Sequence, residues 1–192
     1  ARVIATDASA EQIARAPAHP GIEYRVATAE ASGLPQACAD LVTVAQALHW
    51  FEHDAFWREV SRVLRPGGVV AAWTYGRCVP DDEPVRAIIR RWYAEITGPY
   101  WPPSRVHVDS GYRTIPFPFA EFDGPVLEVR ARFTLAGLVG YAGTWSATVR
   151  MREAQGRDPL PDLAAELAPV WGDPDLPRAM RWPLAMRAGR SA

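Results

Sequence analysis

The sequence has no lysine, few cysteines and no long apolar run, and each of these absences narrows what the protein can be. Arg, Asp or Pro interrupts the apolar stretches, so none approaches the roughly 20 residues that a membrane-spanning helix needs. Cys38 and Cys78 lie in segments of different character and match no metal-binding or redox spacing. We therefore expect two free thiols in a reducing compartment, the cytoplasm, and no metal site.

Neither sign of charge is in excess. The 21 basic and 22 acidic side chains give a formal net charge of -1, and the arginines are scattered along the chain. A nucleic-acid-binding face or an acidic tail would require clustered charge of one sign. The 192 residues, 48% of them hydrophobic, suit one folded domain. We expect a small-molecule partner rather than a nucleic acid or a membrane, and no feature indicates an oligomeric state.

The first 76 residues alternate predicted strands with predicted helices. Apolar and β-branched residues predict four short strands, and apolar residues at helical spacing predict two helices between them. This alternation is typical of an α/β fold with a parallel, Rossmann-like sheet and helices on both faces. The predicted strands are 2–7, 22–27, 40–45 and 69–73, and the predicted helices are 9–16 and 54–64.

Beyond Asp81 the pattern changes to longer helices and a stretch rich in proline and aromatic residues. We expect an irregular connection at 99–118 and a final strand at 181–187, in which Pro183 requires an edge or a bulge. The other predicted elements are helices at 85–96, 134–138, 146–154 and 163–170 and a strand at 125–133. We interpret the chain as one domain, with a cofactor-binding half at 1–76 and a substrate side at 77–192.

Asp7 and the pair Ala29-Glu30 each follow a predicted strand, where ligands of parallel sheets bind. The Asp7 carboxylate could accept hydrogen bonds from the ribose hydroxyls of a nucleoside cofactor, or it could cap the next helix. Ala29 and Glu30 could contact the edge of an adenine ring, although a single Glu in a loop is more often solvated. Neither signal identifies a cofactor by itself.

The segment QALHWF, residues 46–51, follows the third predicted strand. His49 and Trp50 are positioned to line a cleft for a cofactor or substrate, while an aromatic cluster here also suits a hydrophobic core. A helix and the segment RVLRPGG, residues 62–68, then lead to the fourth strand.

Together these segments resemble the class I S-adenosylmethionine-dependent methyltransferases. More narrowly, they are similar to the trans-aconitate-methyltransferase-like branch of methyltransferase type 11, in which the segment after this strand often has the form HWF. The resemblance covers nearly the whole chain. It includes Phe133-Thr134-Leu135, Thr144-Trp145-Ser146-Ala147 and the closing WPLAMRAGR.

The resemblance implies S-adenosyl-L-methionine as the cofactor and methyl transfer to a small molecule, which could be a carboxylate, as the activity. A carboxylate nucleophile needs no general base, so His49 is better suited to shaping the cleft than to accepting a proton; base catalysis by His49 is the alternative. The residues implied at the cofactor are Asp7, Ala8, Ala29, Glu30, Gln46 and Ala47. Those implied at the substrate are His49, Trp50, Tyr112, Tyr141 and Trp145.

Two arginines of the irregular segment, Arg105 and Arg113, could pair with the carboxylate of an organic acid. Arginines in such a segment are more often ordinary solvated surface residues, and both interpretations stay open.

The sequence departs from this family in one respect, because no strand with a glycine-rich GxGxG loop precedes Asp7. Gly67-Gly68 follows a helix rather than opening one and cannot replace that loop. In the family's fold this strand lies between the Asp7 strand and the strand at 40–45. We expect the strand and loop to lie upstream of residue 1, and residues 1–192 alone to be weakly stable and poorly active, since each unpaired buried backbone group costs about 1–3 kcal/mol.

Two other functions compete with methyl transfer. A nicotinamide-dependent dehydrogenase also places an acid after its second strand, but the lack of lysine excludes a Tyr-x-x-x-Lys pair. A truncated or non-catalytic Rossmann-like binding domain would keep the fold and lack the loop. The upstream sequence distinguishes this second alternative from an enzyme.

Overall fold

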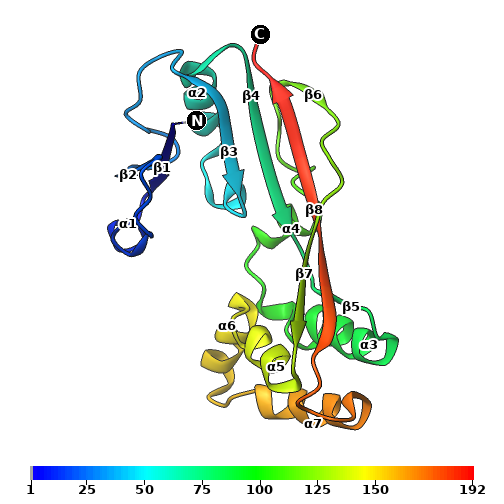
Figure 1. Cartoon of the computed structure of the whole chain (residues 1–192). Helices are drawn as coiled ribbons and strands as arrows, with labels where there is room; N and C mark the ends of the chain where they lie inside the picture. The colour runs from blue at the N-terminus through cyan, green and yellow to red at the C-terminus, as the bar shows by residue number, and fades with distance from the viewer. Residues whose placement is uncertain (1) are drawn as a thin grey trace. The chain divides into compact units, whose positions relative to one another are not determined.

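A computed structural model describes residues 2–192, which form two compact units. Unit 1 contains residues 2–73, Tyr112–Pro125 and Met186–Ala192, and unit 2 contains Thr74–Gly111 and Val126–Ala185. The mixed α/β fold predicted from the sequence is confirmed (Figure 1). Unit 1 includes nearly all of the predicted cofactor half and two later segments that the linear division at residue 76 assigned to the substrate side.

Unit 1 begins with a small parallel sheet. Strands β1 (Val3–Asp7) and β2 (Ile22–Val26) pair in parallel, and helix α1 (Ala10–Arg15) connects them. Ser9 begins the helix because its side chain accepts a hydrogen bond from the backbone N–H of Gln12, as an N-cap does. The predicted strand–helix–strand order is therefore confirmed here.

The second sheet contains the strand that leads into QALHWF. Strand β3 (Ala39–Ala45) pairs in parallel with β4 (Leu64–Tyr75), and between them lie the short 3-10 turn η1 (Leu48–Trp50) and helix α2 (His53–Val63). The long strand β8 (Arg178–Arg190) neighbours β4, and β6 (Ala120–Phe122) pairs with β8. Within residues 2–192, β1 pairs only with β2 and β3 pairs only with β4. This pairing is the one expected if a strand were absent between β1 and β3, while the upstream strand itself stays a prediction.

Unit 2 is mainly helical. Figure 1 shows its helices gathered beside β7 and part of β8. Strands β5 (Val79–Pro80) and β7 (Glu128–Phe133) both pair antiparallel with β8. The helices are α3 (Glu83–Arg91), which continues into the π-helical turn η2 (Trp92–Ile96), then η3 (Gly98–Tyr100), α4 (Arg105–Asp109), α5 (Leu135–Gly143), α6 (Ser146–Gln155) and α7 (Leu160–Trp171).

One hydrophobic core holds unit 2 together. It is built from aromatic and aliphatic side chains of the helices and of β8, including the fully buried Trp171, Ile89 and Leu163. Cys78 belongs to this core, and burial raises the pKa of its thiol to about 12. Both cysteines are free. Because its pKa is raised, the Cys78 thiol stays protonated at neutral pH.

The predicted bounds of two elements in unit 2 and at its borders were wrong. The segment 99–118 is not wholly irregular, because it contains η3 and α4. The last strand is longer than predicted and contains Pro183 in its interior. The N–H of Leu184 points toward β7, because it donates to the carbonyl of Leu127. The backbone nitrogens of neighbouring residues in a strand point to opposite sides. The nitrogen of Pro183 therefore points to the other side of β8, away from β7. On that side β5 pairs only with Arg181 and Met180, so the missing N–H of the proline costs no hydrogen bond to β5.

No helix within residues 2–192 is both long enough and apolar enough to cross a membrane.

Candidate functional site

The carboxyl ends of β1 and β2 lie at one edge of their sheet and carry the first candidate residues. Asp7 ends β1 opposite Val26 of β2, and the N–H of Ala27 donates to the Asp7 carbonyl. One Asp7 carboxylate oxygen, Oδ1, accepts a hydrogen bond from the N–H of Ser9 at 2.7 Å. The structure thus brings Asp7 and Ala8 to the same edge as Ala29 and Glu30, which follow β2.

Glu30 also connects this edge to the segment after β3. Its Oε1 accepts a hydrogen bond from the N–H of Glu52 at 3.0 Å, directly before α2. This bond uses part of a carboxylate that the resemblance assigned to the adenine. No local sequence pattern predicts this bond, because the two residues are 22 positions apart.

A second carboxylate fastens the same loop to α2. Glu59 accepts hydrogen bonds from the N–H and hydroxyl of Ser32 and from the guanidinium of Arg62. The hydrogen bonds from Arg62 are the largest cause that lowers the pKa of Glu59, to about 2. Two carboxylates therefore hold the loop that contains Ala29 and Glu30 to α2: Glu30 binds the residue before the helix, and Glu59 of the helix binds Ser32.

The segment after β3 turns sharply at Gln46. This residue has a φ of +55°, in the left-handed region that non-glycine residues seldom adopt, and its N–H donates to the carbonyl of Trp73 on β4. The turn leads through Ala47 to His49, whose ring lies 4.7 Å from that of Trp50. Trp50 is 63% exposed, so it is a surface residue rather than part of a core.

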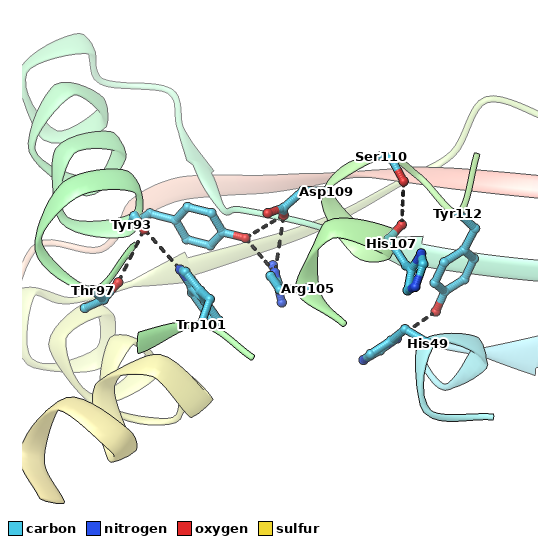
Figure 2. Close-up of polar contacts among 9 residues, drawn as sticks. All are labelled: His49, Tyr93, Thr97, Trp101, Arg105, His107, Asp109, Ser110 and Tyr112. Atoms are coloured by element: carbon cyan, nitrogen blue, oxygen red, sulfur yellow. Dashed lines mark hydrogen bonds and ion pairs between the residues drawn. The ribbon is translucent and has the colours of Figure 1, made fainter. Parts of the chain in front are cut away.

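Tyr112 is brought to His49 from far along the chain. Its hydroxyl lies 3.3 Å from Nδ1 of His49, as Figure 2 shows, and both residues belong to unit 1. Tyr112 is fully buried and has a φ of +65°. Of the five predicted substrate residues, His49, Trp50 and Tyr112 form this one group.

The other two predicted substrate residues, Tyr141 and Trp145, lie in unit 2 and pack against each other. The Tyr141 hydroxyl accepts a hydrogen bond from the indole N–H of Trp182 at 2.8 Å, and burial raises the pKa of the Tyr141 phenol. Trp145 is buried in the core of unit 2, edge-on to Tyr93. Within unit 2, these two side chains take part in aromatic packing.

Sequence reasoning missed a polar cluster of unit 2. The buried Tyr93 donates its hydroxyl proton to Asp109 at 2.7 Å and accepts a hydrogen bond from Nε of Arg105 at 2.7 Å (Figure 2). The Arg105 guanidinium also lies over the rings of Tyr93 and Trp101. Burial, followed by the Asp109 contact, raises the pKa of Tyr93. Arg105 is thus a packed residue rather than a solvated one, whereas Arg113 is exposed.

A surface cavity of about 470 Å³ lies over β7 and β8 of unit 2, beside Asp81. It contains none of the predicted site residues and is lined by charged side chains that include Asp81, Arg130 and Arg181. Within residues 2–192, no group of three or more His, Cys, Asp or Glu side chains is arranged to hold a metal ion.

The edge that carries Asp7 fits part of a nucleoside cofactor. Asp7 Oδ2 makes no hydrogen bond with residues 2–192, so it can accept one from a ribose hydroxyl while Oδ1 keeps the bond to Ser9. Ala8, beside it, is exposed and has only a methyl group, which leaves room for a flat ring. The fit is good at the ribose and weaker at the adenine edge, where Glu30 is engaged with Glu52.

Known proteins resemble this chain along most of its length. Residues 1–72 match the family described as "Methyltransferase domain". A Dictyostelium discoideum protein whose name assigns it to the methyltransferases is 30% identical over 176 residues, which are 91% of this chain and 67% of that protein. A methyltransferase of Claviceps purpurea is 34% identical over 93 residues, which are 46% of this chain and 29% of that protein.

A solved structure extends this likeness to the fold. The structure of an Anaeromyxobacter dehalogenans protein, titled a type II methyltransferase, is 48% identical, with a TM-score of 0.91 over 98% of this chain and 80% of that one. Sequence and structure thus agree with the family that the ordered motifs predicted. The chain belongs to the class I, S-adenosylmethionine-dependent methyltransferases.

Proposed function

We propose that the protein transfers the methyl group of S-adenosyl-L-methionine to a small organic acid, at a carboxylate oxygen. The observation that carries the proposal is the gathering of Asp7, the loop of Ala29 and Glu30, and the segment of Gln46 and His49 within unit 1. The narrower resemblance to the trans-aconitate-methyltransferase-like branch supports the carboxylate acceptor. We expect the protein to act in the cytoplasm.

In this proposal Asp7 binds the ribose hydroxyls through Oδ2, and Ala8, Ala29 and Glu30 contact the adenine. Gln46 and Ala47 would contact the methionine side, and the chain makes a left-handed turn at Gln46. The cofactor supplies a methyl group on a sulfonium, which is already activated toward displacement. The protein's part is then to align the acceptor and to exclude water.

His49, Trp50 and Tyr112 form the acceptor side in unit 1, and we propose that His49 shapes this wall by hydrogen bonding. A carboxylate has no proton to lose at neutral pH, so base catalysis is not required. If turnover by His49→Ala keeps both the rate and the pH profile of the wild type, a proton-accepting role for His49 is excluded.

The first experiment is calorimetric titration with S-adenosylhomocysteine. The resemblance implies a glycine-rich loop that also contacts this ligand, so we propose to compare residues 1–192 with a chain that includes such a loop before Asp7, which should bind more tightly. In the chain that binds more tightly, Asp7→Ala should weaken binding by about tenfold or more, the loss of a charged hydrogen bond. Asp40→Ala, which removes an exposed carboxylate paired with Arg65, is the matched control and should bind normally.

Transfer itself is tested with trans-aconitate as the probe acceptor and mass spectrometry of its methyl ester. Ester formation by the chain that binds the cofactor supports the proposal. Tight binding of S-adenosylhomocysteine without transfer to this or related carboxylic acids would instead favour a non-catalytic binding domain. Binding by neither chain would remove the cofactor from the proposal altogether.

A further inference from the structure

Tyr112 is held in an unfavourable backbone conformation. Its φ of +65° is rare for a bulky side chain, and it persists only where surrounding contacts compensate. Its ring is fully buried and its hydroxyl reaches Nδ1 of His49 at 3.3 Å. The contacts that hold Tyr112 therefore also decide where this hydroxyl lies.

Arg187 on the C-terminal strand β8 supplies part of these contacts, and the N–H of Ile115 also donates to the Tyr112 carbonyl, at 3.1 Å. Nη1 of Arg187 donates to the carbonyls of Tyr112 at 3.0 Å and Ile115 at 2.6 Å. Nε and Nη2 bind both oxygens of the Glu121 carboxylate, at 2.9 and 3.0 Å. The Arg187 side chain is only 10% exposed, and this pairing lowers the pKa of Glu121. A two-pronged pair of this kind fixes the plane of the guanidinium and so the direction of its other donors.

The surroundings of Arg187 are closely packed on the side of the aromatic residues. Its guanidinium lies over the Phe117 ring, with Cζ 4.5 Å from the ring centre. Phe117 and Phe119 pack edge-on against the buried Trp57 of α2. At Gly189 an added Cβ would lie 2.7 Å from atoms of both phenylalanines, so only glycine allows this approach. Arg187 thus has little freedom to move away from the Tyr112 carbonyl.

We infer that Arg187 and Glu121 form a brace that positions Tyr112 against His49, which makes Arg187 a positioning residue for the acceptor side of the site. The inference rests on the proposed function for its effect on methyl transfer. The brace itself rests only on contacts within unit 1. Through the Tyr112 hydroxyl, the last strand of the chain then contributes to the orientation of His49.

The test compares the ring nitrogens of His49 by NMR in four variants. The chain has only four histidines, so the His49 signals can be assigned from a His49→Ala sample. Tyr112→Phe should shift the His49 ring nitrogens, and Arg187→Met and Glu121→Gln should shift them in the same direction. Arg190→Met is the matched control, because Arg190 also lies on β8, binds a backbone carbonyl at Gly67 and lies over a phenylalanine. It should leave the His49 signals unchanged.

Activity provides the second readout, with trans-aconitate as the probe acceptor. Arg187→Met should lower kcat by between about tenfold and a hundredfold and leave the KM for S-adenosylmethionine within about twofold, because misalignment affects the transfer step. His49 signals that coincide in the wild type, Arg187→Met and Glu121→Gln would overturn the brace. An unchanged kcat in Arg187→Met would overturn the role of Arg187 as a positioning residue for methyl transfer. Failure of the wild type to methylate the probe would count against the proposed function, and the NMR comparison would still decide the brace.

Discussion

The first 38 residues and the helical core of unit 2 are packed in different ways. No described residue before Val44 is buried, and α1 places no side chain in a core. In unit 2 the large side chains of Trp171, Ile89 and Leu163 are almost completely removed from solvent. Burial of apolar surface is the main source of stability, so the two regions should differ widely in resistance to unfolding.

The thinly packed region carries four of the six candidate cofactor residues. Asp7, Ala8, Ala29 and Glu30 all lie within it, and hydrogen bonds to Glu52 and Glu59 hold its loop to α2 in place of an apolar core. A ligand that binds this region would supply contacts that the region lacks, and would stabilise it by mass action. Within residues 2–192, the apolar core of unit 2 and the candidate residues at the ends of β1 and β2 therefore lie in different parts of the chain.

The largest expected effect is on the core of unit 2. Trp171→Ala should lower the free energy of unfolding by about 3–5 kcal/mol, because it leaves a cavity in a well-packed core. Urea unfolding followed by near-ultraviolet circular dichroism measures this. Trp50→Ala, at an indole that is 63% exposed, should cost less than about 1 kcal/mol. Equal costs for the two variants would show that burial in the core of unit 2 is not the main source of stability.

Acid should loosen the attachment of the Ser32 loop to α2. The pKa of Glu59 is about 2 in the folded protein, mainly because of Arg62, against an ordinary value of 4.5. A lowered folded-state pKa means that the stabilisation is complete above about pH 4.5 and is lost as pH falls toward 2. The contribution at pH 7 should be about 2 kcal/mol, reduced from the full shift because Arg62 is partly exposed to solvent.

Glu59→Gln should therefore remove most of this stabilisation at pH 7. The free energy of unfolding of this variant should also change less with pH between 5 and 2. Amide hydrogen exchange of the Ser32 loop should accelerate in the same variant. Glu11→Gln, which alters an exposed pair with Arg15 on α1, is the control and should change neither. If the free energy of unfolding of Glu59→Gln still falls as strongly between pH 5 and 2, other carboxylates are responsible for the loss of stability in acid.

Local signals made much of this fold predictable. Ser9 and Thr134 predicted helix starts, and both cap their helices through side-chain oxygens. The strands of the first half follow directly from short apolar runs between turn residues. The interior position of Pro183 could not be predicted, because it depends on which side of β8 is paired at that residue.

The candidate site was predictable only where it is continuous in the sequence. The edge with Asp7, Ala29 and Glu30 and the segment with His49 and Trp50 follow strands, and that rule needs no tertiary information. The Glu30–Glu52 bond and the Arg187 contact with Tyr112 join residues 22 and 75 positions apart. No local pattern marks such pairs, so only the structure could reveal them.

The smallest effect sharpens the comparison, because the same chemical change can be made in both regions. Ser9 caps α1 in the thinly packed region, and Thr134 caps α5, which packs into the core of unit 2. Removing an N-cap hydroxyl costs about 0.5–2 kcal/mol of helix stability. Thr134→Ala should therefore lower the free energy of global unfolding by about 1 kcal/mol, since α5 cannot fray without opening the core.

Ser9→Ala should instead leave global unfolding nearly unchanged and accelerate hydrogen exchange in α1 alone, beginning at the Gln12 amide that loses its acceptor. The Asp7 carboxylate keeps its bond to the Ser9 backbone in this variant, so S-adenosylhomocysteine binding should change little. If Ser9→Ala lowered global stability as much as Thr134→Ala does, α1 would unfold together with the rest of the chain. The thinly packed region would then unfold cooperatively with the core of unit 2.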